Sequence, residues 1–215
     1  MIDGLFIFVL GDMMKGLIIL GVARAGKSTL ADRVARKIGT TGVPVSLFAA
    51  DAMMGGMQSI QKSSFGYACF YRPLKHIMPW LARRYHARLQ RDLVAFLARA
   101  LREQGAVSTV IFEGCYLTPS MAIRMFDPAE FRIVGIGYPN ADITAKMRDI
   151  RKYDVNTPAA RRDDARLTEY IRDKISNSRH LAAECQKYNI PFIDTSTDYH
   201  GQIQAFVDNV IEFLK

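Results

Sequence analysis

The chain has 215 residues, of which 49% are hydrophobic and 23% charged, so its length and composition fit one globular domain with a sizeable core. No apolar run is long enough to cross a bilayer, so no membrane-spanning helix is expected. The three cysteines form neither a metal-binding pattern nor a disulfide framework, so we expect free, buried or half-buried thiols in a reducing, cytoplasmic compartment.

The net charge of +8 is concentrated in two regions. Between residues 72 and 102 there are eight Lys or Arg residues against one acid, Asp92. A second basic region spans residues 146–179. Both regions are candidates to face an anionic ligand.

Residues 1–14 are expected to be an extension that packs as an extra edge strand. After them, the apolar run at 17–20 predicts a buried strand, and residues 28–37 predict an amphipathic helix. Between the two, residues 21–28 read Gly-Val-Ala-Arg-Ala-Gly-Lys-Ser, a complete G-x-x-x-x-G-K-[ST] phosphate loop. Its two glycines allow successive backbone N–H groups to surround phosphate oxygens.

This loop predicts a site for a nucleoside triphosphate. Lys27 is expected to reach the β- and γ-phosphates, and the Ser28 hydroxyl is expected to bind Mg²⁺. The other loop positions expected to bind the nucleotide are Gly21, Ala23, Arg24, Ala25, Gly26 and Thr29.

Strands and helices alternate after the loop. Further strands are predicted at residues 43–48, 107–112, 131–137 and 190–193. Helices are predicted at 74–104, from Thr118-Pro119 onward, and at 141–153, 166–188 and 203–214, with a glycine- and methionine-containing loop at 51–57. This alternation predicts a parallel sheet with helices on both faces.

Two acids stand directly after predicted strands, where open α/β sheets bind their ligands. Asp51 is placed to take a proton from an acceptor hydroxyl, or else it is a helix N-cap or turn residue. Glu113 is placed to hold a Mg²⁺-bound water or the acceptor, or else it pairs with Lys27 or a basic helix.

The predicted helix at 141–153 carries arginines that are candidates to neutralise the γ-phosphate. Arg148 and Arg151 are three residues apart and are expected to share a helix face, as two members of a clamp would. With the polar, basic stretch that follows, they predict a lid at residues 146–166. Solvated surface arginines are the alternative.

Taken in order, these motifs resemble the P-loop kinases of the nucleoside and nucleotide kinase superfamily. The resemblance is carried by the phosphate loop, the acid after the second strand, Val-Ile-Phe-Glu-Gly at 110–114, the arginine-bearing helix after the fourth strand, and Ile-Pro-Phe-Ile-Asp-Thr-Ser at 190–196. The Phe-Glu-Gly ending is similar to that of uridine kinases, and the chain length is similar to that of adenylate kinases. The Asp-Gly-Phe-Pro-Arg signature of adenylate kinases and the Asp-Phe-Tyr of uridine kinases are missing, so the acceptor stays open.

The resemblance implies an α/β three-layer sandwich with a five-stranded parallel sheet of order 2-3-1-4-5. It also implies a helical acceptor-binding insert at residues 51–105, a lid at 146–166, and ATP and Mg²⁺ as cofactors. The adenine would lie near the loop that contains Thr195.

The acceptor is expected to be a small molecule, a nucleoside or nucleoside monophosphate, and the positive charge of the insert favours an anion. The expected ligands are Asp51, Glu113 and the arginines of the insert, Arg72, Arg83 and Arg84. Aromatic residues of the insert are candidates to stack on a base, with core packing as the alternative: Phe65, Tyr67, Phe70, Tyr71 and Trp80. A nucleic-acid acceptor stays open, because eight basic residues exceed what one phosphate needs.

Two other function classes stay open, a hydrolytic P-loop ATPase and a non-catalytic ATP-binding module. A GTPase is disfavoured, since the chain has neither Asn-Lys-x-Asp nor an Asp-x-x-Gly after the third strand. The protein is expected to be a monomer or a homodimer that works away from membranes.

Overall fold

The computed structural model describes residues 16–62 and 108–214, together with positions 78, 80, 84, 91–92, 95–96, 99–100 and 103. Several predictions fall outside these residues: the edge strand in residues 1–14, Arg72, Arg83, and four of the aromatic candidates, Phe65, Tyr67, Phe70 and Tyr71. In the part of the chain that is described, every helix is too short or too polar to cross a lipid bilayer.

Five parallel strands form one sheet: β1 (Gly16–Gly21), β2 (Val45–Ala49), β3 (Thr109–Gly114), β4 (Phe131–Gly137) and β5 (Phe192–Asp194). Their order across the sheet is β2-β3-β1-β4-β5, as predicted. Because β1 is the central strand, the loop that follows it leaves the middle of the sheet at its carboxyl edge.

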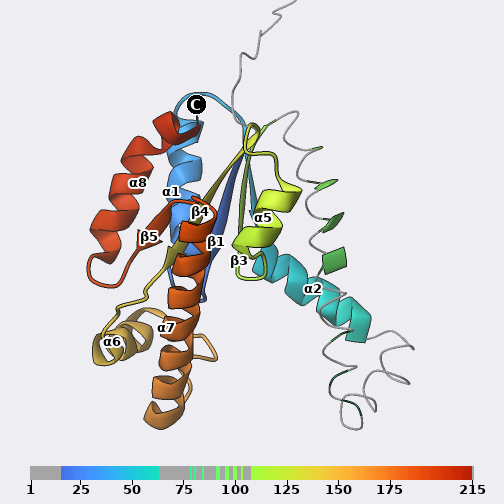
Figure 1. The fold of residues 1–215 in the computed structure, drawn as a ribbon. Helices are drawn as coiled ribbons and strands as arrows, with labels where there is room; N and C mark the ends of the chain where they lie inside the picture. The colour runs from blue at the N-terminus through green and yellow to red at the C-terminus, as the bar shows by residue number, and fades with distance from the viewer. Residues whose placement is uncertain are drawn as a thin grey trace, which may run out of the picture.

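Helices cover both faces of this sheet (Figure 1): α1 (Lys27–Gly39), α2 (Ala50–Lys62), α5 (Pro119–Met125), α6 (Ile143–Tyr153), α7 (Asp164–Lys187) and α8 (Tyr199–Leu214). The pair α1 and α8 packs together on one face, and α5 packs with α7 on the other. The described positions from 80 to 103 are helical as well. The predicted three-layer α/β sandwich is therefore confirmed.

The central strand explains how the three layers are held together. Leu17 and Ile19 are fully buried in the core under α1 and α8, while Ile18 and Leu20 are fully buried in the core under α5. Side chains alternate along a strand, so an apolar run such as 17–20 makes both faces of β1 hydrophobic. This is the pattern expected of a central parallel strand.

Side-chain caps begin three of the described helices, and the start predicted at Thr118-Pro119 is confirmed. Thr118 caps α5 through its side chain, and Pro119 takes the first helical position, where a missing N–H costs nothing. Asp142 and Asp163 cap α6 and α7 in the same way.

The segment after β2 differs from the prediction. Residues 51–57 were expected to form a loop because they contain Gly55 and Gly56, each of which costs a helix about 1 kcal/mol relative to alanine. They are instead part of α2. Its first residue, Ala50, is buried against β3, where the absence of a side chain at Gly114 leaves room for it, since a Cβ there would lie 2.7 Å from the Cβ of Ala50. Tertiary packing of the first turn therefore outweighs the poor local propensity.

Candidate functional site

The phosphate loop, residues 21–28, follows β1 at the carboxyl edge of the sheet, and close packing requires both of its glycines. A Cβ on Gly21 would lie 2.7 Å from the carbonyl oxygen of Ile136. Gly26 has a φ of +97°, and a Cβ there would lie 2.6 Å from Cε2 of Tyr199. A side chain at position 21 would need the backbone around it to shift, and one at position 26 would be strained by the positive φ and would displace the Tyr199 ring.

Helix α1 begins directly after this loop with an uncompensated positive end. Its N-cap is Gly26, which has no side chain to cap the helix, and the first turn contains no acidic residue. The free N–H groups and the helix dipole at this end therefore favour an anion in the loop. Ser28 and Thr29 lie in this first turn and are exposed.

The side chain of Lys27 is only 6% exposed and lies among groups from three segments. Its Nζ donates hydrogen bonds to the Val22 carbonyl at 3.3 Å and to Cys115 Sγ at 3.0 Å. It also lies 3.6 Å from Asp51 Oδ2 and 4.0 Å from Glu113 Oε2. Burial acts to lower the pKa of Lys27, but the neighbouring thiol and carboxylates outweigh it and raise the pKa above its ordinary value. The lysine is therefore held as a cation.

Glu113 at the end of β3 has one satisfied and one unsatisfied oxygen. Oε1 accepts a hydrogen bond from the Ser28 hydroxyl at 2.9 Å. Oε2 is buried and accepts no hydrogen bond from any residue that the structure describes. Magnesium takes oxygen ligands and is commonly held by one or two protein groups plus phosphates and water. The hydroxyl of Ser28 and the carboxylate of Glu113 fit that ion, and within the described ranges no cluster of three His, Cys, Asp or Glu offers a fuller cage.

Asp51 lies in the first turn of α2, and both of its carboxylate oxygens are held by Cys115. Oδ1 accepts from the backbone N–H of Cys115 at 2.9 Å, and Oδ2 accepts from the thiol at 3.1 Å. The Asp51 side chain is 41% exposed, so the carboxylate is fixed in place and yet open to solvent. Cys115 is exposed, contrary to the buried or half-buried thiol we expected, whereas Cys185 is buried.

Three features decide the fold class. The phosphate loop joins the central strand to α1, the sheet has the order 2-3-1-4-5, and the carboxylates that follow β2 and end β3 both lie within 4.0 Å of the loop lysine. The chain has a P-loop kinase-like fold. In this fold, the grouping of Lys27, Asp51 and Glu113 follows from parallel strands that end at one edge of the sheet.

Comparison with known proteins gives distant structural similarity. No protein-family model and no curated protein sequence matches the chain. The chain is similar to a solved structure of a shikimate kinase from Bacteroides thetaiotaomicron, with 17% identity and a TM-score of 0.47 over 94% of this chain and 98% of that chain. It is similar to a gluconokinase from Sinorhizobium meliloti 1021, with 13% identity and a TM-score of 0.48 over 93% of each chain. It is also similar to a deoxyadenosine kinase from M. mycoides, with 14% identity and a TM-score of 0.45 over 91% of this chain and 98% of that chain.

The unsatisfied oxygen of Glu113 leads to a prediction about magnesium. Glu113→Gln keeps the shape of the side chain but removes its charge, so the Mg²⁺ concentration that gives half-maximal ADP binding is expected to rise about ten- to hundredfold. Calorimetric titration of ADP at a series of Mg²⁺ concentrations measures it. The control is Glu169→Gln, an exposed glutamate on α7. An unchanged Mg²⁺ dependence would reduce Glu113 to an ion-pair partner of Lys27.

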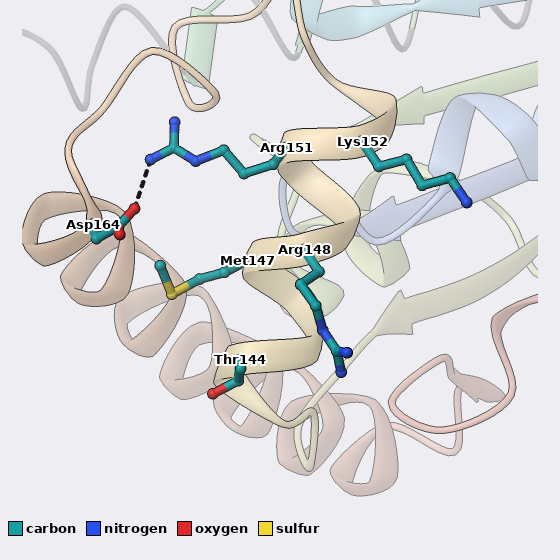
Figure 2. Close-up of a pocket in the computed structure, with 6 residues that line it drawn as sticks. All are labelled: Thr144, Met147, Arg148, Arg151, Lys152 and Asp164. Carbon is teal, nitrogen blue, oxygen red and sulfur yellow. Dashed lines mark hydrogen bonds and ion pairs between the residues drawn. The ribbon is translucent and has the colours of Figure 1, made fainter.

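The two predicted clamp arginines, Arg148 and Arg151, lie three residues apart on α6. They line a pocket of about 430 Å³ between α6 and the start of α7 with Thr144, Met147, Lys152 and Asp164. Figure 2 shows that the Arg151 side chain extends toward Asp164, while Arg148 leaves α6 in a different direction. Both arginines thus line one pocket, as residues that share a helix face would, although their side chains diverge.

The contacts of the two arginines also differ. Arg151 donates to Asp164 Oδ1 at 2.9 Å, to the Arg162 carbonyl at 2.6 Å and to the Ala160 carbonyl. Arg148 is exposed and has no hydrogen bond or ion pair with any residue of the described ranges. Arg151 therefore connects α6 to residues 160–164, within the predicted lid. A role for either arginine at the γ-phosphate stays a prediction.

Side-chain contacts connect the phosphate loop to the end of α6 and to the residue that follows β5. Arg24 has a φ of +67°, a left-handed conformation that costs a residue with a Cβ about 1–2 kcal/mol, and its Nη1 lies 2.9 Å from Asp154 Oδ1. Thr195 is 5% exposed, and its Oγ1 lies 3.0 Å from the Gly137 carbonyl oxygen and 3.5 Å from that of Ala25. Thr195 therefore borders the loop, as its predicted place beside the nucleotide requires.

The acceptor residues are the least defined part of the site. Arg84 is exposed, and the Trp80 side chain is half exposed rather than packed in the core. Their contribution to binding an acceptor stays a prediction.

Proposed function

We propose that this protein is an ATP-dependent kinase that transfers the γ-phosphoryl group of ATP·Mg²⁺ to a small acceptor, a nucleoside or nucleoside monophosphate. The observation that carries the proposal is the position of Lys27 Nζ, 3.6 Å from Asp51 and 4.0 Å from Glu113, at the uncapped start of α1. A cation, a base and a metal-binding carboxylate at one phosphate loop are the parts that phosphoryl transfer needs.

The transfer requires a base and a neutralising cation. The new bond forms between the acceptor oxygen and the γ-phosphorus, and the bond from that phosphorus to the β–γ bridging oxygen breaks. In the proposal Asp51 takes the proton that leaves the acceptor hydroxyl, because its carboxylate is fixed by Cys115 and open to solvent. Lys27 stabilises charge on the phosphates, because it is cationic and shielded from water.

Ser28 and Glu113 hold Mg²⁺ in this proposal. The ion supplies neutralisation of charge on the β- and γ-phosphate oxygens. The hydrogen bond between the Ser28 hydroxyl and Glu113 brings the two oxygen donors together before any ion binds.

The charge of the chain favours the anionic one of these acceptors, a nucleoside monophosphate. The net charge is +8, and residues 72–102 carry eight Lys or Arg residues against one acid. Two or three arginines suffice for a monophosphate, and Arg72, Arg83 and Arg84 are the proposed ligands.

The test is label transfer from γ-labelled ATP·Mg²⁺ to a panel of nucleosides, nucleoside monophosphates, sugars, DNA and RNA. We expect a nucleoside or nucleoside monophosphate to be labelled, and Lys27→Ala and Asp51→Ala to abolish the label. Labelled DNA or RNA, with a rate that falls steeply as salt rises, would replace the small acceptor with a nucleic acid. Phosphate release without any labelled acceptor would make the protein an ATPase.

A further inference from the structure

We infer that Tyr138 and Lys146 are positioning residues for nucleotide binding, because they hold the phosphate loop in its anion-binding conformation from outside. This inference rests on the nucleotide site of the proposed function. Tyr138 follows β4 and Lys146 lies in α6, so neither belongs to the phosphate-loop motif.

The contacts fall on two consecutive carbonyl groups of the loop. The Tyr138 hydroxyl donates to the carbonyl oxygen of Ala23 at 2.9 Å. The Lys146 ammonium group donates to the carbonyl oxygen of Arg24 at 3.0 Å. Two adjacent peptide groups of the loop are thus oriented by side chains that come from other elements.

The direction of these carbonyls decides what the loop can bind. In a trans peptide the C=O and the following N–H point in opposite directions. With the carbonyls of Ala23 and Arg24 turned toward Tyr138 and Lys146, the N–H groups of Arg24 and Ala25 point the other way, and that of Ala25 also donates to the Val22 carbonyl at 3.4 Å. Successive N–H groups that point to one side form a concave site for an anion, whereas a carbonyl turned to that side would repel it.

The loop needs such support because its conformation is unfavourable by itself. Arg24 has a φ of +67°, which L residues with a Cβ rarely adopt. A rotation of the peptide group that precedes Arg24 changes this φ, and it would turn the Ala23 carbonyl away from Tyr138. The hydrogen bond from Tyr138 opposes that rotation, while the hydrogen bond from Lys146 holds the next peptide group.

The two supporting side chains are themselves fixed. Tyr138 is fully buried, and its backbone N–H donates to Ser178 Oγ at 3.1 Å. Lys146 Nζ lies 4.3 Å from the centre of the Tyr138 ring, a cation–π contact that links the two donors. Burial raises the pKa of Tyr138, so its hydroxyl stays protonated and remains a donor.

The cleanest test is Tyr138→Phe, which removes one hydroxyl without changing the net charge. ADP affinity, measured by calorimetry, is expected to fall about three- to tenfold. Lys146→Met is expected to weaken ADP binding about ten- to hundredfold, because a charged donor is lost, and Lys146→Arg is expected to restore most of it. The double variant is expected to lose less than the product of the two single losses, since the donors act on one loop.

Matched controls come from a similar pair at the end of α7, where Lys187 Nζ lies 5.2 Å from the centre of the Tyr188 ring. Tyr188→Phe and Lys187→Met make the same chemical changes, and ADP affinity is expected to stay within about twofold of wild type. Melting temperatures without nucleotide are recorded for all variants.

The outcomes separate this inference from the proposed kinase. Wild-type affinity for ADP in Tyr138→Phe, with or without a lower melting temperature, would overturn the inference and leave the kinase standing. If Tyr138→Phe binds ADP more weakly than wild type, and the wild-type protein labels no acceptor, the inference is supported and the proposed kinase activity is overturned. A wild-type protein that does not bind ADP would overturn both.

Discussion

Replacing Asp51 with asparagine is expected to lower kcat for phosphate transfer about 10²- to 10⁴-fold, the range for loss of a general base. The amide keeps the size of the side chain and can still accept a hydrogen bond from the backbone N–H of Cys115, but it cannot take the acceptor proton. The KM for ATP is expected to change by about twofold or less, because Asp51 acts on the acceptor. Steady-state kinetics with the labelled acceptor measure both constants.

The control for this substitution is Asp32→Asn. Asp32 is an exposed acid on α1 whose partner, Arg36, lies one turn further along the same helix. Its loss is expected to leave kcat unchanged, since exposed ion pairs contribute little. If Asp51→Asn also kept kcat within about fivefold of wild type, Asp51 would be a first-turn acid of α2 and the base would be another group.

The second large effect is expected from Lys27→Met. Loss of a preorganised cation at the transferring group lowers kcat about 10²- to 10³-fold. The substitution also removes the counter-charge of Glu113, whose side chain is 6% exposed, so we expect a loss of stability of about 3 kcal/mol. Kinetics at saturating ATP and urea unfolding measure the two effects separately.

A double variant distinguishes the catalytic loss from the structural one. Lys27→Met with Glu113→Gln removes both charges, so most of the lost stability is expected to return while activity stays lost. Recovery of activity together with stability would show that Lys27 serves the fold rather than the reaction. Stability that stays low would show that the ion pair is not its cause.

Most of the fold could be predicted because its signals are local. The apolar run at 17–20, the phosphate loop and the cap at Thr118 each act within a few residues. The helix α2 could not be predicted in this way, because Gly55 and Gly56 argue for a loop and the packing of Ala50 on β3 is a tertiary effect. The residues around Ala50 in the sequence do not indicate this contact, because its partner lies far along the chain.

The site was predictable where residues follow parallel strands. Lys27, Asp51 and Glu113 meet because three strands end at one edge, and strand order is implied by the fold. The contacts of Cys115 with Asp51 and Lys27 were missed, since a single cysteine has no spacing pattern to signal its position. The place of Tyr138 directly after β4 was a usable signal, but which loop carbonyl it binds depends on geometry alone.

The contacts of α6 limit how the lid segment can move. Asp154, at the end of α6, is paired with Arg24, and Arg151 binds the Ala160 and Arg162 carbonyls and Asp164. The helix is thus fastened both to the phosphate loop and to the start of α7. Because these contacts hold both ends of residues 155–159, closure of the predicted lid over a nucleotide would have to break at least one of them.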